Sequence, residues 1–238
     1  ITAPVVLEAL GQAFFSMSIG MGVLITYGSY IRKNDNIGNS AAAISAADTI
    51  IAILSGVAIF PAVFAFGIEP TAGPGLVFIT LPSIFNSMPA GYFFAILFFV
   101  LLLIAALTSS ISVLEVVVAY ATEQLGWHRR KATLVAAVAI SVVGVLCTMS
   151  QGPWDHLSAY GRNVFDWLDW TSANLLLPLG GFLIVIFTGW FLSKPLVKDE
   201  ITNQGTAKAV FFGAYLFIIR FIAPIAIGLV FLFGLGVL

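Results

Sequence analysis

Charged side chains are scarce in this sequence. Lysine, arginine, aspartate and glutamate make up 9% of its 238 residues, against about a quarter in a soluble domain, and hydrophobic residues make up 60%. The formal net charge is −1, and no basic cluster is interleaved with aromatic residues, so the electrostatic pattern of a nucleic-acid-binding protein is missing. We therefore expect the lipid bilayer, and not nucleic acid, to be the partner of this chain.

Cysteine and histidine are also rare. Cys147, the only cysteine, lies in an apolar run without ligand-like neighbours, so we expect an inert, buried thiol. The two histidines, His128 and His156, fall in connections predicted on opposite sides of the membrane, and the pair Asp166 and Asp169 falls at the end of a span. The sequence thus disfavours an intramembrane hydrolase, and we expect no catalytic residues and no enzyme.

Uncharged runs dominate what remains, and most are near the roughly 20 residues that a helix needs to cross the hydrocarbon. They predict an all-α membrane protein. The six predicted transmembrane helices lie at about residues 9–31, 42–67, 90–124, 130–150, 168–192 and 208–237.

Glycine and proline cluster at residues 67–75, between the second and third predicted spans, and an apolar stretch follows. Such a segment breaks a helix. Because its apolar side chains would otherwise be wetted, we expect residues 68–89 to form an outer loop that packs on the bundle as a lid.

Basic residues concentrate in alternate connections. By the positive-inside rule these connections are cytoplasmic, which makes the chain a multi-pass protein of the cell (inner) membrane with its C-terminus outside. The sequence opens at Ile1 without an initiator methionine or a signal peptide, and we expect it to be a piece of a longer protein. The basic residues that support this orientation are Arg32, Lys33, Arg129, Arg130, Lys131, Lys194, Lys198 and Lys208.

The first predicted span carries a helix-weakening pattern near its middle. Gly20 and Gly22 flank a single methionine, and Ser16 and Ser18 precede them. Glycine destabilises a helix interior, so the pattern predicts a discontinuous helix, whose released carbonyls would bind a cation or an ammonium group where they line a cavity. A tight helix contact through small residues is the alternative, and the local sequence leaves both open.

Three consecutive hydroxyl residues, Thr108, Ser109 and Ser110, lie inside the third predicted span. In lipid such hydroxyls commonly donate to the carbonyl about four residues earlier. They can instead act as hard oxygen ligands of a cation, and positions 105, 108 and 109 have the spacing that shares one helix face. The local pattern leaves both interpretations open.

Two acidic residues lie in or beside predicted spans. Asp48 is placed at the start of the second span, where it is either a functional group or a solvated helix cap. Glu115 lies in the third span, and we interpret it as a satisfied polar contact in preference to a buried proton-sensitive group.

Four segments resemble the neurotransmitter:sodium symporter family, in the family's order. GQAFFSMSIGMGVLITYGSYIRKN at residues 11–34 resembles its sixth span, and LTSSIS at residues 107–112 resembles the ion-binding turn of its eighth span. FITLP at residues 78–82 resembles its outer lid, and DWLDW at residues 166–170 resembles the start of its tenth span. Within the family, the Gly-Met-Gly break is most similar to bacterial transporters of hydrophobic amino acids.

The resemblance implies a fold and a missing part. The six spans would match spans 6 to 11 of the leucine-transporter inverted-repeat fold, and the first span would be discontinuous. The family's first five spans would precede Ile1. They would be the chain's partner within one transporter domain, and would complete each binding site.

The resemblance also implies two sodium sites. The Ala105 carbonyl and the hydroxyls of Thr108 and Ser109 match the family's second site. Ser16 and Asp48 match its first site, where the carboxylate of the bound amino acid also contacts the ion.

A chloride requirement is not expected. Many relatives have asparagine where Asp48 stands and bind chloride nearby. Gln12 and Ser16 match chloride-site positions, but Ala52 replaces the serine used there. A fixed carboxylate at Asp48 would supply the missing negative charge.

The resemblance finally implies a substrate and a mechanism. We expect sodium-coupled symport of neutral hydrophobic L-amino acids, aliphatic and aromatic, by alternating access, and Asp169 matches the acidic residue of the family's outer gate. An ion channel is the alternative outside this family, and the asymmetric set of polar groups argues against it. The residues that match the substrate site are Phe15, Ser16, Ser18, Met21, Ser109 and Val113.

Overall fold

The computed structural model describes residues 2–32, 35–65, 67, 75–154, 156, 158–202 and 212–237. These residues form helices and their connections, with no β-strand among them beyond one isolated bridge between Ala159 and Arg162. The predicted all-α class is confirmed. Lys33, Lys208 and the first part of the predicted lid, residues 68–74, lie outside the described residues, as do residues 208–211 of the last predicted span.

Among the described residues, five helical stretches are long and apolar enough to cross a bilayer. Three are single α-helices and two contain π-helical segments (η), in which the backbone is wound more loosely. The single helices are α3 (Ile37–Ala65), α5 (Gly91–Glu123) and α6 (Arg129–Ser150). The fourth stretch is α7 (Val164–Trp170), η2 (Thr171–Leu176), α8 (Leu177–Ile186) and η3 (Phe187–Phe191). The fifth is α10 (Phe212–Phe217), η4 (Ile218–Ile222) and α11 (Ala223–Gly234).

Large apolar side chains on these helices are widely exposed in the chain by itself. Val57 on α3, Leu103 on α5 and Leu134 on α6 are 65%, 69% and 67% exposed. Soluble monomers rarely expose so large an apolar surface to water. The exposure fits helices that lie in lipid or against further membrane spans.

The first span is discontinuous, as predicted. Helix α1 (Ala3–Ser16) and helix α2 (Val23–Tyr30) are separated by residues 17–22. Gly20 and Gly22 have φ angles of 91° and 84°, in the left-handed region that glycine adopts without a steric cost, and Ser18 shares this region at 53°. The break therefore depends on the two glycines that the sequence singled out.

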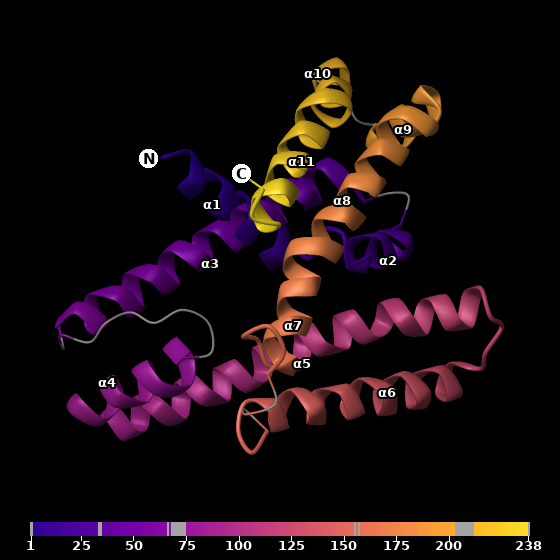
Figure 1. Ribbon diagram of the computed structural model, residues 1–238. Helices are drawn as coiled ribbons and strands as arrows, with labels where there is room; N and C mark the ends of the chain where they lie inside the picture. Colours follow the sequence, from indigo (N-terminus) through magenta and orange to yellow (C-terminus); the bar gives the residue numbers. More distant parts are fainter. Residues whose placement is uncertain are drawn as a thin grey trace. The chain divides into compact units, whose positions relative to one another are not determined.

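The helices group into two compact units, Ile1–Ala41 with Ser112–Leu238, and Ala42–Ile111. In the first unit, α8 and α11 run beside each other and α1 packs against both (Figure 1). The second half of α5 packs against α6 through four small or β-branched side chains, which let the two helices approach closely. These buried residues are Val118, Ala121, Ala132 and Ala136.

The second unit contains the segment that the sequence predicts to be an outer lid. Residues that the sequence assigned to a loop form η1 (Leu76–Thr80) and α4 (Leu81–Ser87). Leu81 and Ile84 are buried against Val63 near the end of α3, and Phe98 of α5 packs on the same cluster. The described part of the segment is thus helical where the sequence predicted a loop, and it packs in part on helices of its own unit, while Phe78 and Ile79 are 65% and 70% exposed.

Three helices begin earlier than their predicted spans. Helix α1 begins at Ala3 instead of about residue 9, with Pro4 in its first turn, and an asparagine caps each of the other two. The side chain of Asn36 accepts a hydrogen bond from the Asn39 amide at 2.9 Å, and α3 begins at Ile37 instead of about residue 42. Asn163 forms a capping box with Asp166, and α7 begins at Val164 instead of about residue 168. Asp48 consequently lies well inside α3, and its interpretation as a helix cap was wrong.

The break packs on α8 by direct contact between backbones. A Cβ atom on Gly20 would overlap the Leu177 carbonyl oxygen and would lie 2.8 Å from the Gly181 nitrogen. A Cβ atom on Gly180 would lie 2.5 Å from the Gly20 carbonyl oxygen. Only glycine fits on both sides of this contact.

We predict that Gly20→Ala destabilises the protein. A methyl group at this position is strained by the left-handed backbone and also collides with α8, which together cost about 2–5 kcal/mol. The measurement is thermal or denaturant unfolding of the purified protein. Gly28→Ala in α2 is the matched control, because a Cβ atom there meets nothing within 4 Å. Equal stability of the two variants would contradict the contact.

Candidate functional site

The end of α1 turns sharply where the break begins. The Ser18 amide donates to the Phe15 carbonyl at 3.1 Å, and the Ile19 amide donates to the Phe14 carbonyl at 2.9 Å. Each carbonyl oxygen has two lone pairs, so these turns leave it an acceptor position. Ser16 is the last residue of α1. The predicted ammonium-binding groups are thus at the point where the helical ladder stops.

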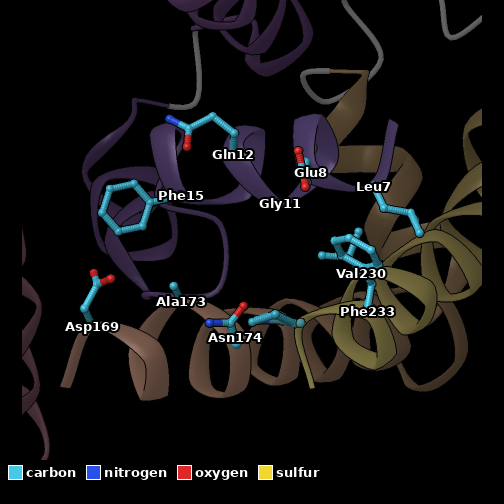
Figure 2. A pocket seen from close by; sticks show the side chains of 12 residues that line it. Leu7, Glu8, Gly11, Gln12, Phe15, Asp169, Ala173, Asn174, Val230 and Phe233 are labelled. Carbon is cyan, nitrogen blue, oxygen red and sulfur yellow. The ribbon is translucent and has the colours of Figure 1, made fainter. Parts of the chain in front are cut away.

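An open cavity of about 340 Å³ lies beside α1 and is also lined by α7, η2, α8 and α11 (Figure 2). Phe15 lines it from α1, and Val230 and Phe233 line it from α11. The carboxylates of Glu8 and Asp169 also line the cavity. The space is mostly apolar, and two negative groups at its wall favour a cationic neighbour.

Met21 and Val113 lie on elements that meet at the end of the break. A Cβ atom on Gly22 would lie 3.2 Å from the Cγ1 atom of Val116, which places the start of α2 against α5. Val113 precedes Val116 by three residues and lies on a similar side of α5. These predicted pocket residues are therefore in one region of the first unit.

The three consecutive hydroxyl residues of α5, Thr108, Ser109 and Ser110, lie in the second unit. The Thr108 hydroxyl donates to the Ala105 carbonyl at 2.8 Å, and the Ser110 hydroxyl donates to the Ala106 carbonyl at 2.7 Å. The expected local bonding is therefore present. It holds the Thr108 oxygen close to the Ala105 carbonyl oxygen on one face of α5.

Asp48 is also in the second unit, half-buried on α3. Eleven residues of the same helix precede it, so its carboxylate lies about 16 Å along the axis from the first residue of α3. An ionisable side chain at such a depth is a functional candidate. Ser16 belongs to the first unit and Asp48 to the second.

Two parallel side-chain contacts join α2 to α5. The Tyr27 hydroxyl donates to the Ser112 hydroxyl at 2.7 Å, and the Tyr30 hydroxyl donates to the Glu115 carboxylate at 2.8 Å. The donors are three residues apart on α2 and the acceptors are three residues apart on α5, so the two helices are in register. A guanidinium nitrogen of Arg129, at the start of α6, donates to the other Glu115 oxygen at 2.7 Å.

Glu115 is therefore a satisfied polar contact, as we expected. Its side chain is 16% exposed and that of Arg129 is 62% exposed. Its partners, Tyr30 and Arg129, were not predicted from the sequence. The sequence signal for this pairing is the equal spacing of the two tyrosines in Tyr-x-x-Tyr on α2 and of the two acceptors in Ser-x-x-Glu on α5.

We predict that Glu115→Gln and Tyr30→Phe each lower the melting temperature, and that the double variant lowers it by less than the sum. The reason is that both changes disrupt the same hydrogen-bonded cluster. Differential scanning fluorimetry of the four proteins of this cycle measures the effect. Glu200→Gln, an exposed acid on α9 (Lys194–Ile201), is the control for loss of a negative charge. Full additivity would show that the two side chains act independently.

Comparisons with known proteins agree with this arrangement. The family model described as "Sodium:neurotransmitter symporter family" matches residues 1–238 of this chain. The chain is 40% identical to the sodium-dependent transporter YhdH of Bacillus subtilis (strain 168), over 100% of this chain and 53% of that protein. It is 39% identical to a sodium-dependent transporter of Haemophilus influenzae, over 99% of this chain and 51% of that protein.

A solved structure is similar throughout. The crystal structure of MhsT in complex with L-phenylalanine matches with a TM-score of 0.86 and 42% identity, over 97% of this chain and 52% of that one. The chain spans about half the length of the curated relatives that it matches. Together with the broken first span, these matches show that the chain belongs to the sodium:neurotransmitter symporter family.

Proposed function

We propose that the complete transporter carries neutral hydrophobic L-amino acids, aliphatic and aromatic, together with sodium by alternating access. The observation that carries the proposal is the break between α1 and α2, which turns backbone carbonyls out of the helical ladder beside a largely apolar cavity. Family membership supports the use of sodium. The complex of the similar MhsT with L-phenylalanine supports a hydrophobic amino acid as substrate.

In this proposal the substrate ammonium binds at the carbonyls of Phe15 and Ser16 and the Ser18 hydroxyl. Met21 and Val113 form the walls around the apolar side chain of the substrate, and Ser109 is the remaining residue of the proposed substrate site. Met21 is unbranched and adaptable, so its pocket would accept side chains of different shapes. The missing first five spans would close the other side of this pocket.

Two sodium sites belong to the proposal. Ala105, Thr108 and Ser109 would provide the second site, for which the contact between the Thr108 hydroxyl and the Ala105 carbonyl already brings two oxygens together. Ser16 and Asp48 would provide part of the first site. A sodium ion in a low-dielectric site needs a nearby negative charge, and Asp48 would supply it without chloride.

Asp169 would act at an outer gate. It lines the cavity beside α1, where a positive side chain of the missing first span would reach it. In the same orientation the basic connections are cytoplasmic and the C-terminus is outside, as the positive-inside rule predicts for a protein of the cell membrane.

The test of this function is uptake by the complete transporter in proteoliposomes. We expect saturable accumulation of labelled leucine or tryptophan when an inward sodium gradient is imposed, and none when potassium replaces sodium. Transport that does not saturate, or that cannot exceed the external concentration, would favour a channel. Accumulation without a sodium gradient would contradict sodium coupling.

Thr108→Val should weaken sodium activation. The change keeps the shape of the side chain and removes a hydroxyl ligand, so the sodium concentration for half-maximal uptake should rise about tenfold or more. Ser110→Ala removes a hydroxyl two residues along the same helix and should change it by less than about threefold. Similar shifts for the two variants would place the second sodium site elsewhere.

Asp48→Asn should depress sodium-driven uptake, most strongly in chloride-free buffer. Adding Ala52→Ser to this variant would recreate the family's chloride pattern, and chloride should then restore part of the activity. Uptake in chloride and in gluconate for the parent, the single variant and the double variant decides the matter. A chloride requirement in the parent would show that Asp48 is not the built-in counter-charge.

A further inference from the structure

The structure assigns a binding site for an anionic phospholipid to the seam between η3/α8 and η4/α11, with Arg220 holding the headgroup phosphate and an apolar groove holding an acyl chain. The site is independent of the proposed transport function. It rests on the position of Arg220, on the aromatic side chains around it, and on the groove further along the same seam.

Arg220 lies within the fifth membrane-crossing stretch and reaches across to the fourth. Its Nε atom donates to the Gly189 carbonyl at 2.6 Å. Gly189 is in the last turn of η3, where carbonyls have no amide partner further along the helix. This contact caps a negative helix end and uses one of the five N–H donors of the guanidinium group.

The remaining donors of Arg220 face no acidic side chain at salt-bridge distance in the described ranges. The sequence from residue 189 to residue 220 carries four basic and two acidic side chains. The two acids, Asp199 and Glu200, are on α9 beside Lys198. An excess of positive charge at one membrane face attracts anionic lipid, and a guanidinium group binds phosphate through paired hydrogen bonds.

Aromatic side chains mark this level as a membrane interface. Trp190 is the penultimate residue of its membrane-crossing stretch, and Lys194 follows it in the connection. The Arg220 guanidinium lies 5.8 Å from the Trp190 ring, and Phe221 packs on Trp190 at 5.9 Å. Trp190 and Phe221 are 56% and 46% exposed. Exposed aromatic rings at a helix end are typical of the headgroup boundary.

An apolar groove of about 290 Å³ lies further along the same seam, away from Arg220 and Trp190. Leu179 and Phe182 line it from α8, and Gly228 and Phe231 line it from α11. Leu179 and Trp190 are eleven residues apart, and Phe221 and Gly228 are seven apart, so on each helix the groove shares a side with the aromatic cluster. The groove and the cavity beside α1 share Pro178 but otherwise use different residues of α8.

The distance between these features fits one lipid molecule. Gly228 lies about 12 Å along the helix axis from Arg220. One leaflet contributes about 15 Å of hydrocarbon. An acyl chain whose phosphate is at Arg220 therefore reaches the groove.

The experiment is native mass spectrometry of the complete transporter, released from nanodiscs that contain phosphatidylglycerol and phosphatidylcholine. We expect the parent to retain phosphatidylglycerol preferentially, and Arg220→Gln to retain about tenfold less. Lys131→Gln is the matched control, because Lys131 is also a span-end cation over a tryptophan, 4.8 Å from the Trp127 ring. It should retain as much lipid as the parent.

A second variant tests the groove and leaves Arg220 unchanged. A Cβ atom on Gly228 meets nothing within 4 Å, so Gly228→Leu fills the groove without a backbone clash. We expect it to lose retained phosphatidylglycerol as well, whereas Gly144→Leu on α6, another open position, should not. The proposal is overturned if the parent retains no phosphatidylglycerol. This is the result expected if other spans of the complete transporter cover the seam. If Arg220→Gln does not fold, normal retention by Gly228→Leu overturns it.

Discussion

The contact between the backbone of the break and the backbone of α8 is the constraint on which the rest of this structure depends. In a membrane, an interrupted helix is tolerated only where protein covers the freed backbone groups. Gly20 approaches Leu177 and Gly181 so closely that no side chain fits between them. This contact fixes where α1 ends and α2 begins, and with it the direction of the carbonyls that we propose bind the substrate.

Helix α2 connects this break to a polar cluster. It begins at Val23, directly after the break, and ends at Tyr30, whose hydroxyl donates to Glu115. Its eight residues span only about 12 Å, so the break and the polar cluster lie at the two ends of one short helix. A change in the break that displaced α2 would therefore also disturb the contacts of Tyr27 and Tyr30 with α5.

Sequence reasoning succeeded where the determinant is local and failed where it is tertiary. The break was predictable because a left-handed backbone conformation selects glycine at positions 20 and 22. The early start of α3 was missed because the pattern of apolar residues outweighed a single capping asparagine. The partners of Glu115 depend on the register between α2 and α5, which hydropathy does not encode. The roles of Asp48 and Thr108 in ion binding stay predictions, since their proposed partners include spans outside this chain.

The central claim is that substrate and sodium bind together at the broken span, and mutual enhancement of binding tests it most directly. In equilibrium binding to the complete transporter, sodium should raise the affinity for a hydrophobic amino acid by some factor. Thermodynamic linkage then requires the amino acid to raise the affinity for sodium by the same factor. Amino-acid binding that is identical in sodium and in potassium would contradict the account.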